Sequence, residues 1–299
     1  MQKKAAKKEM IKEASSEISI KKLELTANKI RQDIIKMLFA ANSGHTAGPL
    51  GMVEIFTALY FKILKHDPKN PKLEDRDRLI LSNGHICPVQ YACMANSGYF
   101  PEKELLTLRK INTRLQGHPN RLDLPGLENS SGPLAQGSSI AAGIALAAKM
   151  DRKDYTVFCL MSDGEHQEGQ IWEALMFAGN KKLNNFIGII DRNNIQIDGY
   201  VEDIMSIERL RQKLEAFNCN VYEMNGNDMK EVVVTLENVL KNRNKTTRPS
   251  IIIAKTVPGK GISFMENKYE WHGRPPKKEE AEAALKELQA EREIIINKR

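Results

Sequence analysis

Two oxygen-bearing side chains, Asp163 and Asn193, each follow a short apolar stretch of the kind that forms a buried strand. The stretches 155–161 and 186–190 are rich in β-branched residues, and 171–178 between them has apolar residues at helical spacing. This order predicts a strand–helix–strand unit, whose right-handed crossover brings the carboxyl ends of both strands to one edge of a parallel sheet. Asp163 and Asn193 should therefore face one crevice, where oxygen ligands suit Mg²⁺ or Ca²⁺ and a phosphate that shares the ion.

Histidine residues supply a second chemical signal. Four of the six lie in glycine-containing loops at the expected ends of strands or helices: His45, His85, His118 and His272. A single loop histidine usually has a structural role, but four in similar positions favour one shared polar site. His85 lies just past the expected strand 76–82, so it should point into the crevice at the carboxyl edge of the sheet.

The rest of the chain predicts the elements that must position these groups. Apolar residues at helical spacing predict four further helices: 23–41, 52–65, 138–150 and 229–242. The segments 218–224 and 250–255 predict further strands. Helix 138–150 consists mainly of small residues, which permit close packing, and we expect it to be wholly buried. Strands that alternate with helices in this way predict an α/β domain.

Composition and charge limit the class of protein. The 299-residue chain has a net charge of +7, and residues 1–22 contribute over half of it, with seven lysines against three glutamates. We interpret this segment as a solvated basic extension, since no aromatic–basic interleaving indicates nucleic-acid binding. The four cysteines form no CxxC pair, which favours reduced thiols. Without a signal-peptide pattern or eighteen consecutive apolar residues, we expect a cytoplasmic protein with no membrane contact.

Five motifs, in this order, resemble the N-terminal part of transketolase, which binds the pyrophosphate of thiamine diphosphate. They are SGHTAGPLG at 43–51, RDRLILSNGH at 76–85, QGHP at 116–119, GPLAQG at 132–137 with DGEHQEG after it, and WHGRPP at 271–276. The resemblance implies the thiamine diphosphate-binding fold, a mostly parallel central sheet with helices on both faces. It divides the chain into a basic extension 1–22, a pyrophosphate-binding domain 23–276 and a charged C-terminal helix 277–299.

The resemblance also implies a role for individual residues. Mg²⁺ or Ca²⁺ would be held by the side chains of Asp163 and Asn193 and by the backbone carbonyl of Ile195. Besides these metal ligands, the residues in contact with the cofactor would be His85, Gly132, Leu134, Gly164, Glu168 and His272. Glu168 would also join a carboxylate network at a subunit interface. His45 and His272 would move the proton of the donor's C3 hydroxyl, and His118 would contact the donor's terminal hydroxyl.

The sequence departs from the transketolase pattern in two respects. Ser162 stands where these enzymes commonly have the first glycine of a Gly-Asp-Gly turn, although a small residue is kept. The pyrimidine-binding and C-terminal domains of transketolases do not fit after residue 276. The resemblance therefore implies the N-terminal subunit of a split transketolase of the pentose phosphate type, which moves a two-carbon ketol group from a ketose phosphate to an aldose phosphate. It would act only with a partner subunit that carries the pyrimidine-binding domain, in a heterotetramer.

Three alternatives stay open. The substrate could be an unusual sugar phosphate or a sulfo-sugar. The reaction could be that of another thiamine diphosphate enzyme, such as a deoxyxylulose-phosphate synthase or the α subunit of a 2-oxo acid dehydrogenase. A basic module that binds nucleic acid without catalysis is the remotest of them, and salt-dependent binding of DNA or RNA would support it.

Overall fold

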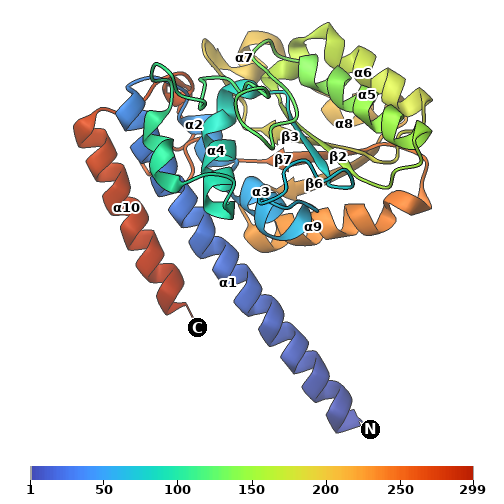
Figure 1. The fold of residues 1–299 in the computed structure, drawn as a ribbon, viewed down its shortest axis with the longest axis horizontal. Helices are drawn as coiled ribbons and strands as arrows, with labels where there is room; N and C mark the ends of the chain where they lie inside the picture. Colours follow the sequence, from blue (N-terminus) through green and yellow to red (C-terminus); the bar gives the residue numbers. More distant parts are fainter. Residues whose placement is uncertain (1, 299) are drawn as a thin grey trace.

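A five-stranded parallel sheet forms the centre of the molecule (Figure 1). The structure is a computed structural model that describes residues 2–298, with side chains from residue 20 onward. The strand order is β1 (Arg78–Leu81), β2 (Val157–Ser162), β3 (Phe186–Arg192), β7 (Ser250–Lys255) and β6 (Asn220–Asn225). All four pairings are parallel, and each strand begins and ends within two residues of its predicted segment. The predicted α/β class is thus confirmed.

Helices cover both faces of the sheet and enclose two separate hydrophobic cores. On one face lie α5 (Gln136–Met150), α6 (Gly169–Asn180) and α8 (Leu210–Ala216). The other face carries the larger set: α1 (Gln2–Ala41), α2 (Ala47–Gly51), α3 (Val53–Ala58), α4 (Cys87–Ser97) and α9 (Met229–Asn242). Strands covered on both sides have no polar face, which explains why β2 is buried along its whole length and reads as an unbroken apolar run.

Two long helices lie side by side at the edge of the molecule, α1 and α10 (Lys278–Asn297) (Figure 1). Ala281, Ala284 and Leu288 are the buried residues of α10, while its charged residues remain at the surface. The Asn28 side chain donates to the Leu288 carbonyl at 2.8 Å and fixes the register of the pair. α1 continues through the boundary predicted at residue 22, and the side chains of the basic extension up to residue 19 lie outside the described residues.

The structure corrects two helix predictions. Helix α5 is not wholly buried, because Ile140 and Met150 are 39% and 74% exposed. One side of α5 packs on the sheet and another on α6, and within the described chain no element covers the remaining side. The helix predicted over 52–65 is interrupted: α3 ends at Ala58 and a π-helical turn, Leu59–Ile63, follows it.

Two glycines in α5 should respond oppositely to substitution by alanine. A Cβ atom on Gly137 would lie 2.5 Å from the Cα of Ser82, so Gly137→Ala must push α5 away from the end of β1 and should cost about 2 kcal/mol or more. Gly143 is exposed, and no neighbouring atom of the described chain lies within 4 Å of the place that a Cβ would occupy. Gly143→Ala should therefore stabilise the helix by up to about 1 kcal/mol. Urea unfolding of both variants measures the difference, and equal effects would contradict this account of α5 packing.

Candidate functional site

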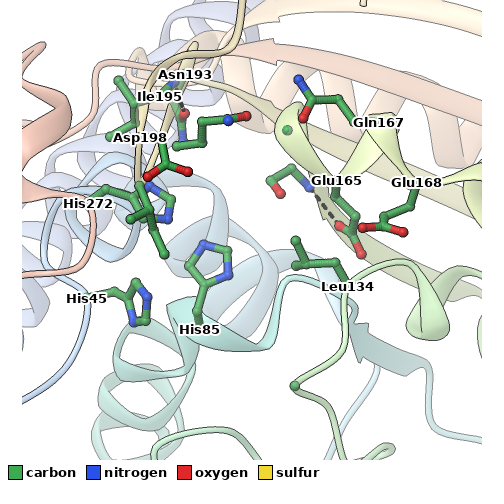
Figure 2. A pocket seen from close by; sticks show the side chains of 15 residues that line it. His45, His85, Leu134, Glu165, Gln167, Glu168, Asn193, Ile195, Asp198 and His272 are labelled. Atoms are coloured by element: carbon green, nitrogen blue, oxygen red, sulfur yellow. Dashed lines mark hydrogen bonds between the residues drawn. The ribbon is translucent and has the colours of Figure 1, made fainter. Parts of the chain in front are cut away.

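A cavity of about 350 Å³ opens at the carboxyl ends of β2 and β3, where the crevice was predicted. Figure 2 shows His45, His85 and His272 grouped on one side of it and Glu165, Gln167 and Glu168 on the other. Nine of the residues assigned to the site from sequence line the cavity: His45, His85, Gly132, Leu134, Gly164, Glu168, Asn193, Ile195 and His272. Two others, Asp163 and His118, lie beside it without lining it.

Asp163 lies at the end of β2 and is fully buried. Its Oδ1 accepts a hydrogen bond from the backbone N–H of Gly164 at 2.8 Å. Its Oδ2 accepts one from the Asn194 backbone N–H at 2.5 Å and one from the Arg192 guanidinium at 3.0 Å. Burial raises the pKa of Asp163, and these donors act against that rise. The carboxylate is therefore held by the two turns that follow β2 and β3.

Asn193 is oriented by its neighbours on β3 and β4 (Ile195–Gln196). Its Nδ2 donates to Asp191 at 2.7 Å and its Oδ1 accepts from the Ile195 backbone N–H at 3.0 Å. Burial raises the pKa of Asp191 to about 7, although the Thr256 hydroxyl donates to that carboxylate. The Asn193 amide is thus anchored at both its nitrogen and its oxygen.

The oxygen atoms of this turn fit a hard divalent cation. Asp163 offers a carboxylate, Asn193 an amide oxygen and Ile195 a backbone carbonyl, which are ligand types of Mg²⁺ and Ca²⁺. Within residues 20–298, no group of three or more His, Cys, Asp or Glu side chains could hold a metal. A cation at this place would thus depend on the amide and carbonyl oxygens as well as on Asp163.

The four loop histidines come together, as the sequence predicted. The ring centroid of His45 lies 4.9 Å from that of His85, 5.5 Å from His272 and 6.4 Å from His118. His45 follows α1, His85 lies in the turn after β1, His118 lies in the loop before α5, and His272 follows the short turn Tyr269–Trp271. Four loops distant in the sequence therefore place four imidazoles around one space.

Burial keeps these imidazoles neutral at pH 7. It lowers the pKa of His45 and of His272 to about 4, and the neighbouring His272, Arg109 and His118 lower that of His45 further. The pKa of His85 is also lowered, mainly by burial. The Nδ1 atoms of His45 and His272 are buried and have no hydrogen-bond partner among the described residues. Buried polar atoms are rarely left unpaired, so these two nitrogens suit a bound ligand.

Sequence reasoning missed two groups that organise the site. The Glu165 carboxylate accepts hydrogen bonds from the Ser82 hydroxyl, from the Ala135 N–H at 2.6 Å and from the Ser162 N–H at 3.0 Å. Glu165 thus joins the ends of β1 and β2 to the start of α5. Its position two residues after Asp163 was the sequence signal that could have identified it. Arg109 donates to the Ser43 hydroxyl at 3.1 Å and to the Gly117 carbonyl at 3.3 Å, and so connects the loops of His45 and His118.

These features together fit thiamine diphosphate. Asn193 and Ile195, which offer hard oxygen ligands, line this cavity. His45 and His272 line it too, and their Nδ1 atoms have no hydrogen-bond partner among the described residues. The Gly164 backbone N–H lies beside Asp163 and donates to its carboxylate, and Gly132 leaves open backbone near the ring of His118. A diphosphate group needs a cation and N–H donors, and the organic part needs a partly apolar wall such as Leu134 provides.

Comparison with known proteins agrees with this geometry. The family described as "Transketolase, thiamine diphosphate binding domain" matches residues 23–295. The chain is 42% identical over 277 residues to an apulose-4-phosphate transketolase subunit of Actinobacillus succinogenes, covering 92% of this chain and 98% of that protein. It is 40% identical over 269 residues to 6-deoxy-6-sulfo-D-fructose transketolase subunit SqwG of a Clostridium species, covering 90% and 97%.

Solved structures give the same relationship. The crystal structure of transketolase from Campylobacter jejuni matches with a TM-score of 0.83 at 35% identity, over 91% of this chain and 45% of that one. The chain therefore belongs to the transketolase family and carries its thiamine diphosphate-binding domain. It corresponds to the N-terminal portion of full transketolases and spans less than half the length of that solved chain. The predicted family and fold are confirmed.

Acidification should destabilise the chain. His45, His166 and His272 have a folded pKa of about 4 against an ordinary value of 6.5, so between pH 7 and 5 only the unfolded chain takes up these protons. Asp191 acts in the opposite direction, because its folded pKa of about 7 lies above the ordinary 3.8. Three groups against one leave a net loss of unfolding free energy on the order of 3 kcal/mol between pH 7 and 5.

Other buried groups act in both directions on this balance. Burial lowers the pKa of His85 and His118, and it raises the pKa of Asp77, Asp163 and Glu165. Urea unfolding at pH 7 and at pH 5, with ionic strength fixed, measures the net effect. Equal or greater stability at pH 5 would show that the histidines are not held neutral in the folded chain.

Proposed function

We propose that this chain is the thiamine diphosphate-binding subunit of a transketolase that transfers a two-carbon ketol group from a ketose phosphate to an aldose phosphate. The observation that supports this most strongly is one cavity that contains both an oxygen-ligand turn and a cluster of neutral histidines. The bound cofactor would supply the electron sink for cleaving a carbon–carbon bond, a reaction that side chains alone do not readily perform.

The residues of this chain would bind the cofactor and move protons. Asp163, Asn193 and the Ile195 carbonyl would hold Mg²⁺, while Gly164 would donate its N–H to the diphosphate. His45 and His272 would accept and return the proton of the donor's C3 hydroxyl. A neutral imidazole is required to accept a proton, and a pKa of about 4 keeps both residues in that form.

Three further contacts complete the proposed site. His85 would bind the cofactor beside the reacting carbon, and His118 would donate a hydrogen bond to the donor's terminal hydroxyl. Gly132 and Leu134 would lie against the organic part of thiamine diphosphate. Glu168 is exposed at the edge of the cavity, which suits its proposed place in a carboxylate network with a partner chain.

We also propose that a second chain completes the enzyme. The relatives from Actinobacillus and Clostridium are each named as one subunit of a transketolase, and this chain covers nearly their whole length. The partner would carry the pyrimidine-binding domain, and two copies of each chain would form a heterotetramer in the cytoplasm. Within the described residues, no helix is both long and apolar enough to cross a bilayer.

A specific observation favours a second candidate substrate. The two relatives matched over nearly their full length are named for apulose-4-phosphate and for 6-deoxy-6-sulfo-D-fructose. The same ketol transfer from one of these donors would use the same histidines and the same metal turn. The donor would then differ mainly in the groups that the partner subunit recognises.

Reconstitution tests the proposed function. The purified chain with Mg²⁺ and thiamine diphosphate should show almost no turnover of xylulose 5-phosphate with ribose 5-phosphate. Co-expression with the product of a neighbouring gene that resembles the rest of transketolase should restore it. Apulose 4-phosphate and 6-deoxy-6-sulfo-D-fructose, assayed in parallel, identify the donor. Robust turnover by the chain alone would contradict the two-subunit proposal, and inactivity of the complex on all three donors would contradict ketol transfer from them.

A further inference from the structure

Arg192 places a positive charge at the proposed metal turn, which comprises Asp163, Asn193 and Ile195. Its Nη1 lies 3.0 Å from Asp163 Oδ2, and its Nη2 lies 2.6 Å from Glu202 and 2.9 Å from Glu208. The Arg192 side chain is only 14% exposed, and that of Asp163 is 1% exposed. One guanidinium thus pairs with three carboxylates, one of which is the proposed ligand of Mg²⁺.

The three carboxylates belong to different segments. Asp163 follows β2, Glu202 lies in α7 (Val201–Met205), and Glu208 lies between α7 and α8. Helix α7 has other attachments, because the Val201 N–H donates to the Asn194 carbonyl at 3.0 Å and the Gln167 side chain donates to the Met205 carbonyl at 2.7 Å. Helix α7 is therefore held by contacts besides that with Arg192, and the distinctive contact of Arg192 is the one with Asp163.

A buried carboxylate is costly unless a positive charge lies beside it. In the structure Arg192 provides that charge at Asp163, and a bound Mg²⁺ would provide it at the same oxygen atoms. Two cations near one carboxylate repel each other. Glu202 and Glu208 can keep the charge of the guanidinium paired after it leaves Asp163. The arginine therefore does not need to become fully solvated.

We propose that Arg192 is a positioning residue that takes the place of the metal at Asp163 in the cofactor-free chain and thereby weakens Mg²⁺ binding. This inference rests on the proposed role of Asp163 as a metal ligand. When Mg²⁺ binds, the guanidinium leaves Asp163 and keeps its contacts with Glu202 and Glu208. The arginine therefore stabilises the empty turn and sets the Mg²⁺ concentration at which the site fills.

Mg²⁺ titration of the full chain tests this, with thermal unfolding as the readout at a fixed concentration of thiamine diphosphate. In Arg192→Gln the Mg²⁺ concentration at half-saturation should fall by about tenfold, because the competing charge is gone. In EDTA the same variant should unfold at a lower temperature than the wild type. Arg192→Lys keeps the charge and should stay close to the wild-type half-saturation.

Two further variants provide a control with unchanged Mg²⁺ binding and a test in which Mg²⁺ binding should become weaker. Arg211 pairs with Glu215 and Glu223 at 3.0 Å each and is 42% exposed, so Arg211→Gln should leave the midpoint of the Mg²⁺ titration unchanged. Glu202→Gln removes one carboxylate that receives the displaced guanidinium, so more Mg²⁺ should be needed. This variant also keeps the inference testable if Arg192→Gln does not fold.

The outcomes separate this inference from the proposed function. Unchanged or weaker Mg²⁺ binding in Arg192→Gln, with a normal response in the wild type, would overturn the role of Arg192 alone. A Glu202→Gln variant that binds Mg²⁺ as the wild type does would overturn it as well. If neither the wild type nor any variant responds to Mg²⁺ and thiamine diphosphate, the metal turn itself is wrongly assigned, and the inference falls with it.

Discussion

Asp163→Asn is expected to lower Mg²⁺-dependent affinity for thiamine diphosphate by about 100-fold or more while the chain stays folded. The substitution removes the only carboxylate among the three proposed ligands, and a divalent cation loses most of its electrostatic attraction with it. The chain should stay folded but lose some stability. A neutral amide avoids the cost of burying a charge, whereas its NH2 cannot accept the hydrogen bonds that one carboxylate oxygen now accepts. Glu202 and Glu208 still neutralise Arg192.

Titration of thiamine diphosphate into the chain at saturating and at zero Mg²⁺, in the presence of the partner subunit, measures the effect. Asp203→Asn is a matched control, since Asp203 is an exposed carboxylate on α7 that does not line the cavity. Circular dichroism should show the same helix and strand content for both variants. Unchanged cofactor affinity in Asp163→Asn would contradict the assignment of the metal turn.

Much of the fold followed from local patterns in the sequence. The strands were predictable because a parallel sheet covered on both faces needs continuous apolar runs, as in Val157–Ser162 and Ser250–Lys255. The exposure of α5 was not predictable, because small residues such as Gly143 permit close packing but do not reveal whether a neighbour is present. A sequence pattern reports which side of a helix can be buried, whereas burial itself depends on what lies against it.

The site was predictable to the extent that it depends on strand ends. Asp163 and Asn193 meet because parallel strands end at one edge of the sheet, and His85 follows the same rule after β1. The roles of Glu165 and Arg109 were not predicted, because they come from contacts between segments that are distant in the sequence. Arg109, for example, packs so closely on Gly117 that a Cβ atom there would lie 2.6 Å from its Cζ. No spacing in the sequence encodes that contact.

His45→Gln is expected to reduce kcat by about 10²- to 10⁴-fold in the complex with the partner subunit, with cofactor affinity within a few fold of wild type. His45 lies at the centre of the histidine cluster, 4.9 Å from His85 and 5.5 Å from His272. Its Nδ1 has no partner in the described part of the chain. Glutamine can donate a hydrogen bond at this place but cannot accept a proton, so binding should survive and proton transfer should not.

The pH profile distinguishes this role from a structural one. The pKa of His45 is lowered to about 4, so His45 is neutral throughout pH 5.5–8 and the wild-type rate should show no titration of His45 there. Below pH 5 the rate should fall as His45 becomes protonated and loses the lone pair that accepts the proton. His66→Gln is the control. His66 forms hydrogen bonds with Tyr99 and with the Tyr60 carbonyl away from the cavity, so this variant should leave kcat unchanged. A wild-type midpoint near 6.5 would show that His45 is not held neutral by burial, and an unchanged kcat in His45→Gln would assign the proton transfer to another group.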